Sequence, residues 1–206
     1  MARRQDLDSK QRLFRAAAVE FAARGYEAAG VDRIAAKARI NKAMLYYHFG
    51  SKLDLYVEVL RDMFRAVGGR ARALADGPGT APDKMDTWIA TIVEESSARP
   101  WFPPIMLREL ASGIPHFDAD TLALMGGIYG AVRDIIAQGR REGVFRDADP
   151  LLTHLTIMPA VLAYFVRERA IAARPATALP FAESRGRDEF IRHMQQTVRG
   201  MLRGEE

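Results

Sequence analysis

The stretch that decides the fold is residues 25–55, which read GYEAAGVDRIAAKARINKAMLYYHFGSKLDL. It holds two short segments of helical spacing, 31–38 and 42–48, joined by a connection of three residues. A longer helix precedes them, because apolar residues recur at helical spacing from Phe14 to Phe21. Three helices of these proportions, with a tight turn between the last two, are typical of a helix-turn-helix.

The longer helices on either side have recognisable ends. The helix before the turn is predicted to begin near Asp8, which with Gln11 can cap its first turn, and to end at Gly25. Ser51 is predicted to open a long helix after the turn, and Asp54, three residues on, completes a capping box.

The second short helix is predicted to be the one that enters the major groove of DNA. Lysine can donate to guanine or to phosphate, methionine and alanine can touch a thymine methyl, and tyrosine and histidine can donate to phosphate oxygens. The first turn of the next helix has free backbone N–H groups that also favour a phosphate. The candidate DNA-contacting residues are Lys42, Ala43, Met44, Tyr46, Tyr47, His48 and Lys52.

Tyr46 and Tyr47 could instead be core aromatics. Neighbours on a helix point about 100° apart, so two adjacent side chains rarely face the same core. Leu45 and Phe49, four residues apart, form the better core pair. At least one of the two tyrosines is therefore predicted to be exposed.

The remainder of the chain is also predicted to be helical, which makes the fold class all-α. Sustained apolar–polar alternation and Asn-Gly or Asp-Gly hairpin turns are absent from the sequence. The clearest break in the helical pattern is the Pro- and Gly-rich segment 76–82. Beyond it, helices are predicted at about 83–98, 102–112, 118–142, 150–172 and 186–203.

The charge is unevenly distributed. The chain of 206 residues carries a net charge of +4. Residues 1–70 hold 14 Lys and Arg against 8 Asp and Glu, so this third of the chain contributes +6 and the rest −2. A basic end suggests a polyanionic partner, although a chance imbalance of surface charge would look the same.

The sequence argues against an enzyme, a metalloprotein and a membrane protein. It has no cysteine, and its four histidines are not spaced as ligands, so neither a metal site nor a cofactor is expected. Neither a Gly-x-Ser-x-Gly elbow nor a phosphate-binding glycine loop occurs. The N-terminus does not resemble a secretory signal. The longest uncharged stretch, 150–166, has 17 residues and is read as a buried helix.

The helix-turn-helix segment resembles the N-terminal signature of the TetR family of transcriptional regulators. The likeness is carried by Gly25 to Ala28 and by the string from Leu45 to Phe49, followed by Ser51 and Lys52. It extends over about residues 8–68.

Two positions depart from the family pattern. Gly30 stands where the family often has threonine, and Arg39 stands where its turn usually has glycine. A left-handed Arg39 would cost about 1 kcal/mol. Asn41 replaces a common serine, and both residues are good helix N-caps.

The resemblance implies an all-α homodimer with two parts. Residues 1–50 would form the operator-binding domain, and residues 51–206 a helical domain that binds a small effector and dimerises. Most such proteins are cytoplasmic repressors that the effector releases from DNA.

Large, soft side chains in the second part could line the effector pocket, although ordinary core packing explains each of them as well. Three polar side chains among them could anchor the ligand: Arg108, His116 and Tyr129. The candidate ligand-binding residues are Trp88, Ile92, Trp101, Phe102, Met106, Arg108, Leu110, His116, Met125, Tyr129, Met158 and Phe165.

The last two helices are predicted to form the dimer surface, as a four-helix bundle with the partner subunit. The alternative is that the same residues pack within their own chain. Both arrangements are possible together if one face of a helix packs inward and another packs against the partner subunit. The candidate residues are Leu151, Leu155, Leu162 and Phe165 on the first helix and Phe190, Met194, Val198 and Met201 on the second.

A ligand-responsive repressor is therefore the leading hypothesis. A helical enzyme with an anionic substrate lacks any recognisable catalytic group. A DNA-binding protein without a small-molecule effector remains the alternative, although some 130 residues of C-terminal chain are more than that function needs.

Overall fold

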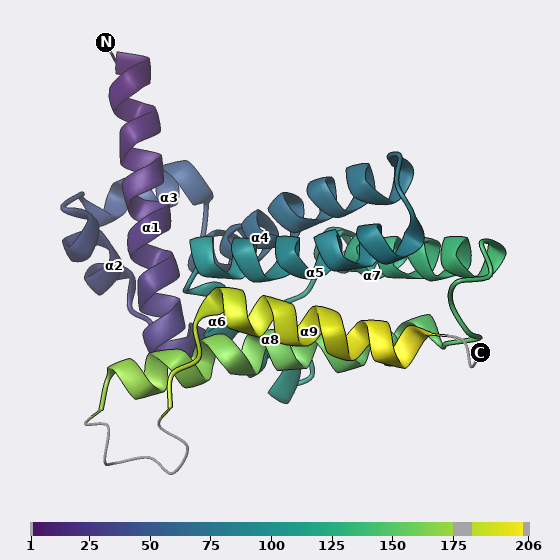
Figure 1. Cartoon of the computed structure of the whole chain (residues 1–206). Helices are drawn as coiled ribbons and strands as arrows, with labels where there is room; N and C mark the ends of the chain where they lie inside the picture. Colours follow the sequence, from purple (N-terminus) through teal and green to yellow (C-terminus); the bar gives the residue numbers. More distant parts are fainter. Residues whose placement is uncertain (1, 175–182, 204–206) are drawn as a thin grey trace. The chain divides into compact units, whose positions relative to one another are not determined.

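The computed structural model describes residues 2–174 and 183–203, with side chains from Asp6 onward. Over these residues the fold is all-α, as predicted, with a single isolated β-bridge between Phe145 and Arg203. Figure 1 labels the helices. Their bounds are α1 Ala2–Ala28, α2 Val31–Ala38, α3 Lys42–Phe49, α4 Lys52–Asp76, α5 Ala81–Ala98, α6 Phe102–Ala111, α7 Ala119–Arg141, α8 Pro150–Ala172 and α9 Arg187–Leu202.

The beginning of α1 is where the sequence prediction was wrong. The helix begins at Ala2 rather than near Asp8, so Asp8 lies in a helix interior and caps nothing. A capping signal marks a place where a helix can begin, but it does not prevent preceding residues of good helix propensity from continuing the helix. The other end was predicted correctly, because Gly25 has φ 76° and breaks the helical geometry.

Side chains cap several helices in the way the sequence indicates. Asn41 Oδ1 accepts from the Ala43 N–H at 2.9 Å, which caps α3. Ser51 Oγ accepts from the Asp54 N–H at 3.0 Å and donates to Asp54 Oδ2 at 2.6 Å, which caps α4. Each cap satisfies backbone donors that a helix end leaves unpaired.

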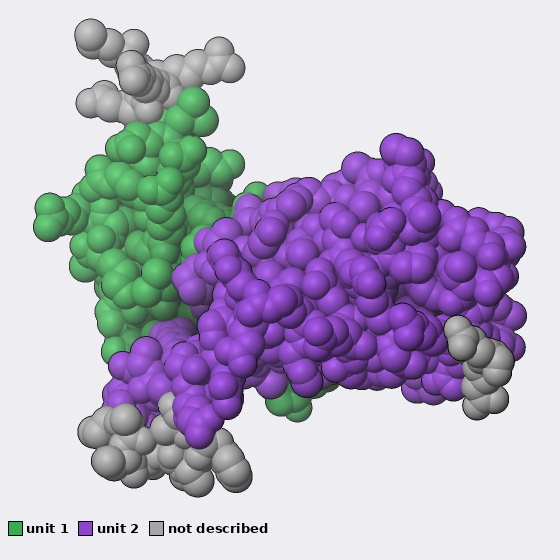
Figure 2. All heavy atoms as spheres, in the orientation of Figure 1, with its two compact units in different colours: residues 1–63, 101–121 green, residues 64–100, 122–206 purple. Residues whose placement is uncertain are grey.

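The chain divides into two compact units, shown in Figure 2. Unit 1 comprises residues 1–63 and 101–121, and unit 2 comprises residues 64–100 and 122–206. This division differs from the expected boundary at residue 50, because α6 packs on α1 and the first half of α4 belongs to unit 1. A single boundary in the sequence cannot describe a unit that is built from two separate segments.

Unit 1 has an apolar core to which α1, α2, α3 and α4 all contribute. Phe21 packs edge-to-face on Tyr56, with ring centroids 4.8 Å apart. The buried side chains include Leu13, Ala17 and Phe21 from α1, Ile34 and Ala35 from α2, Leu45 from α3, and Leu55, Tyr56, Val59 and Leu60 from α4.

Two neighbouring residues of α6 make polar contacts with other helices of unit 1. Arg108 donates to the carbonyl of Ala22 at 2.8 Å, near the end of the regular part of α1. Glu109 is buried and accepts from Tyr56 Oη at 2.7 Å and from His116 Nδ1 at 2.8 Å. The pKa of Tyr56 is raised far above its ordinary value, mainly by burial and secondly by this hydrogen bond to Glu109. The Tyr56 hydroxyl therefore stays neutral.

Unit 2 is a bundle of α5, α7, α8, α9 and the second half of α4. Phe145 lies so close to α7 that a Cβ at Gly139 would stand 2.1 Å from the Phe145 ring, so only glycine fits there. The buried core includes Trp88, Ile89, Ile92 and Val93 from α5, Val132, Ile135 and Ile136 from α7, Ile157, Val161 and Leu162 from α8, and Met194, Val198 and Leu202 from α9.

The residues predicted for the dimer surface differ in burial. Phe165, Phe190 and Met201 are partly exposed. Leu162, Met194 and Val198 are buried in the core of their own chain. Leu151 and Leu155 are about half exposed, as is their neighbour Leu152 at 63%. The α8 helix thus has one face inside unit 2 and a leucine-rich face outside it.

Arg39 provides a test of backbone strain. It has φ 54° and ψ 47°, the left-handed geometry that costs a residue with a Cβ about 1 kcal/mol. We expect Arg39→Gly to be more stable than Arg39→Ala by about 1 kcal/mol, measured by urea unfolding. Both variants lose the same guanidinium group, so the difference between their unfolding free energies reports the strain of the left-handed backbone alone. Equal stability would contradict a strained turn.

Candidate nucleic-acid interface

The α3 helix presents polar and aromatic side chains on one face and one buried anchor on the other. Leu45 is fully buried, whereas Tyr46 is 50% and Tyr47 71% exposed. Both tyrosines are therefore exposed, and the prediction that at least one would be is confirmed. Lys42 and Ala43 are exposed as well, and Met44 is partly so.

Asp32 is a residue of this surface that the sequence analysis missed. It lies in the first turn of α2, and its Oδ1 is 3.1 Å from the Nζ of Lys42 in α3. Asp32 is 82% exposed, so the pair lies at the surface. A carboxylate can accept from the amino group of cytosine but is repelled by phosphate. An exposed acid at the start of the helix before the turn was the signal that could have identified it.

The structure corrects the expectation that His48 is exposed. Its side chain is 4% exposed, and Nε2 lies 2.6 Å from Ser9 Oγ. Ser9 donates its one hydroxyl proton to the Asp6 carbonyl at 2.7 Å, so Nε2 of His48 is the donor to Ser9. His48 joins α3 to α1, and its position near the end of a short helix explains why periodicity did not reveal this contact.

Lys52 is held in place at the start of α4. Its ammonium lies 4.4 Å from the centre of the Tyr26 ring and 3.3 Å from the Glu27 carbonyl oxygen. A cation fixed over an aromatic ring loses less side-chain entropy when it binds an anion. The geometry suits the phosphate contact expected of this residue.

Arg12 stabilises the turn between α2 and α3. It donates to the carbonyls of Ala38, at 2.5 Å, and Arg39, at 3.1 Å, and thereby satisfies acceptors left free where α2 ends. Beside it, an open cleft of about 600 Å³ is lined by four basic and three small apolar residues: Arg12, Arg15, Lys37 and Arg39, with Ala16, Val19 and Ala38. Unit 1 therefore concentrates positive charge around the turn.

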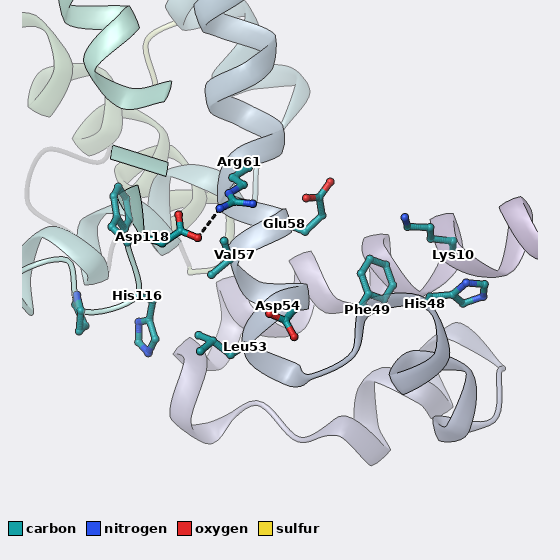
Figure 3. A pocket seen from close by; sticks show the side chains of 12 residues that line it. Lys10, His48, Phe49, Leu53, Asp54, Val57, Glu58, Arg61, His116 and Asp118 are labelled. Carbon is teal, nitrogen blue, oxygen red and sulfur yellow. Dashed lines mark hydrogen bonds and ion pairs between the residues drawn. The ribbon is translucent and has the colours of Figure 1, made fainter. Parts of the chain in front are cut away.

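A second cleft of unit 1, of about 510 Å³, lies along the first turns of α4 (Figure 3). Figure 3 shows Leu53, Asp54 and Val57 between His48 and Phe49 on one side and His116 and Asp118 on the other. Arg61 forms an ion pair with Asp118. The hydrogen bond that Arg61 donates within this pair holds the pKa of Asp118 well below its ordinary value. Acidic and basic groups alternate here, so the cleft has no single charge preference.

The twelve residues expected to line an effector pocket are divided equally between the two units. Trp101, Phe102, Met106, Arg108, Leu110 and His116 belong to unit 1, and Trp88, Ile92, Met125, Tyr129, Met158 and Phe165 belong to unit 2.

Three of the residues in unit 1 are unsuited to the role expected of them. Leu110 is 48% exposed, Arg108 is bound to carbonyls of α1, and His116 is bound to Glu109. Arg108 and His116 are engaged by tertiary side-chain contacts, which composition and spacing do not show.

The described residues contain no group of three or more His, Asp or Glu side chains placed to hold a metal ion.

Comparison with known proteins gives the family. Residues 13–59 match the model of bacterial regulatory proteins of the tetR family. Over 165 residues the chain is 32% identical to the HTH-type transcriptional repressor SCO4008 of Streptomyces coelicolor, covering 78% of this chain and 80% of the relative. The chain belongs to the TetR family.

Other TetR-family proteins match along nearly the whole chain. The HTH-type transcriptional repressor NicS of Pseudomonas putida is 27% identical over 95% of this chain and 93% of its own. The ketosteroid regulator KstR2 of Mycobacterium tuberculosis has a TM-score of 0.73 at 23% identity, covering 95% of each chain. PfmR of Thermus thermophilus has a TM-score of 0.71 at 22% identity, covering 95% of this chain and 96% of its own. The TetR-family fold thus extends through both units, and the protein is a transcriptional regulator.

His48 is expected to act on stability. Replacing it by alanine removes its hydrogen bond and leaves Ser9 without this partner, at a cost of about 1–3 kcal/mol in unfolding free energy. Urea unfolding measures this cost. Ser9→Ala should lower the unfolding free energy by a smaller amount than His48→Ala. Tyr47→Ala, which truncates the exposed neighbour, should change stability by less than about 0.5 kcal/mol. A wild-type stability for His48→Ala would mean that the bond to Ser9 contributes nothing.

Proposed function

We propose that this TetR-family regulator is a repressor that binds a pseudo-palindromic operator as a homodimer and is released by a small, mainly apolar effector. The observation that carries the proposal is the exposed face of α3, where Lys42, Tyr46 and Tyr47 surround a helix fixed by the buried Leu45. The family match over residues 13–59 covers this helix. Two relatives that match over 78% and 95% of this chain bear the name repressor, which supports the same role. Action on an operator would place the protein in the bacterial cytoplasm.

The partner subunit is proposed to cover the leucine-rich face of α8. Leu151, Leu152 and Leu155 are each half exposed or more in the single chain, which is a large apolar surface to leave in water. By length and composition alone α8 could also cross a membrane, with 22% of its most apolar window buried. We favour a second copy of this chain as the occupant, because α8 carries its other face into the core of unit 2.

The effector is proposed to act through a change in the relative populations of two subunit arrangements. The α4 helix begins in unit 1, directly after α3, and ends in unit 2, so it belongs to both. An effector that binds one arrangement more tightly shifts the population toward it. Coupling of this kind is typically about 1–3 kcal/mol, and operator DNA must weaken effector binding by the same factor.

Dimeric operator binding gives the first test of function. Footprinting on selected DNA should show symmetric protection of two half-sites, about 34–36 Å or a multiple of that apart. Leu152→Glu with Leu155→Glu should give a monomer by analytical ultracentrifugation and abolish this footprint. Leu110→Glu, at a similarly exposed leucine of unit 1, serves as the control and should remain dimeric. A wild-type monomer at micromolar concentration would refute the proposal.

The residues of the interface should separate into two functional groups. Lys52→Ala and Tyr47→Phe should weaken binding to all DNA sequences, and Lys52→Ala should reduce the salt slope by about 1 per subunit, because phosphates carry no sequence information. Lys42→Ala and Met44→Ala should instead alter base preference, measured by selection from a random library. Wild-type affinity and preference in all four variants would show that α3 is not the reading helix.

Asp32 allows a sharper form of this test. Asp32→Asn removes a negative charge that phosphates repel, so affinity for random DNA should rise. Base preference should change at the same position that Lys42→Ala affects, because the two side chains form a pair. Asp120→Asn makes the same charge change elsewhere in unit 1 and should leave base preference unchanged. A rise in affinity without any change in preference would limit Asp32 to an electrostatic effect.

A further inference from the structure

Arg39, in the turn between α2 and α3, combines a strained backbone with a side chain that has no partner. Its φ of 54° lies in the left-handed region, which glycine adopts without strain. The residue is exposed, and in the part of the chain that the structure describes no hydrogen bond or ion pair engages its guanidinium group. No contact of that group therefore offsets the strain. A strained residue held in this way points to a role in binding.

The cleft that Arg39 lines is strongly basic. Arg12, Arg15 and Lys37 line it as well, and no acidic side chain of the described residues does so. Arg15, from α1, is exposed and, like Arg39, makes no hydrogen bond or ion pair with the described residues. Lys37 is 47% exposed and lies 3.7 Å from Glu20, the long end of an ion pair. Two free guanidinium groups and a loosely paired ammonium group thus face the same open space.

The other residues that line the cleft are small and apolar. Ala16 and Ala38 are buried, and Val19 is 46% exposed. Small side chains allow a bulky ligand to approach the cations closely, but they offer no deep pocket for a large apolar group. Arg12 fixes one wall, because it binds the carbonyls of Ala38 and Arg39. The cleft therefore favours a ligand whose main feature is negative charge.

The position of the cleft beside α3 indicates which anion it meets. Arg39 precedes Lys42, the first residue of α3, by three residues, and three residues span at most about 11 Å. The major groove is about 12 Å wide, so a helix inside it has a phosphate backbone close by on each side. A guanidinium group matches phosphate with two parallel hydrogen bonds. DNA phosphate is thus the anion that the surroundings of the cleft favour.

We propose that Arg15 and Arg39 form a phosphate-binding site of unit 1 that holds the DNA backbone beside the groove read by α3. This site shares no residue with the contacts expected from α3 and Lys52. Because phosphates carry no sequence information, it raises the affinity for all DNA and leaves base preference unchanged. The inference rests on the proposed DNA-binding function of α3, to which it adds a separate set of contacts.

The test measures binding of the full-length protein to a random-sequence duplex of about 30 base pairs, roughly three helical turns. Fluorescence anisotropy over a range of salt concentrations gives the affinity and the salt slope. Arg15→Ala and Arg39→Gly should each bind about tenfold more weakly, the loss expected for a hydrogen bond between charged groups. Each should also reduce the salt slope by about 1 per subunit.

Arg24→Ala is the matched control. It removes an exposed guanidinium group of the same helix as Arg15, but one that is paired with Glu20 at 2.9 Å. At physiological ionic strength, charges more than about 8 Å away are largely screened, so this variant should change the affinity by less than about twofold.

A comparison of Arg39→Gly with Arg39→Ala separates binding from folding. The two variants lack the same guanidinium group but differ in backbone strain, so they should bind DNA equally weakly while their urea unfolding curves differ. Affinity that follows stability would mean that Arg39 only shapes the turn, and would overturn the proposal. Wild-type affinity and salt slope in both Arg15→Ala and Arg39→Gly would overturn it too. So would a loss of affinity for poly-L-glutamate alone, which would assign the cleft to an acidic protein.

Selection of an operator from a random library distinguishes this inference from the function on which it rests. If the wild type selects an operator but both cleft variants bind DNA as the wild type does, the phosphate site is wrong and the regulator stands. If the cleft variants lose affinity for random DNA but the wild type selects no operator, the site stands and the repressor proposal fails. Where both hold, Arg15→Ala and Arg39→Gly should select the same base sequence as the wild type.

Discussion

The DNA-binding unit depends on the burial of one side chain, Leu45. The α3 helix has eight residues, and a helix of this length is not stable alone in water. Leu45 is fully buried, so packing rather than propensity holds the helix in place. Because one face is fixed inward, Tyr46 and Tyr47 must point outward. The cap from Asn41 and the bond between His48 and Ser9 then secure the two ends of the helix.

The second constraint on unit 1 is supplied by a segment that follows it in sequence by about forty residues. Arg108 and Glu109 of α6 reach α1 and α4 with hydrogen bonds of 2.7–2.8 Å, and Glu109 does so from a buried position. A buried carboxylate that lost these donors would be left unpaired at high cost. Any movement of α6 is therefore energetically connected to the helices that carry α3. This connection ties the position of α6 to that of the helix-turn-helix.

Unit 2 shows the opposite use of polar groups. Its core is mainly apolar, ion pairs such as Arg72–Asp134 and Arg199–Asp86 lie at its surface, and α8 has a long uncharged stretch with leucines on the outside. Four buried side-chain atoms of the described part of unit 2 nevertheless have no hydrogen-bond partner within the chain: Asp86 Oδ1, Trp88 Nε1, Ser96 Oγ and His154 Nδ1.

The sequence by itself determined the elements of this protein. The bounds of α5 to α9 lie within two residues of those predicted, because helical periodicity, Pro and Gly breaks and caps are local in origin. The capping box at Ser51 and the exposure of a tyrosine on α3 follow from the same local rules, and the family signature lies within one continuous segment. Only the tertiary structure decided which distant groups meet. It buried His48 against Ser9, placed Asp32 beside Lys42, assigned α6 to the DNA-binding unit and left Trp88 and His154 adjacent and unpaired. These contacts join residues of different helices, and periodicity gives the face on which a side chain lies but not the partner that it meets.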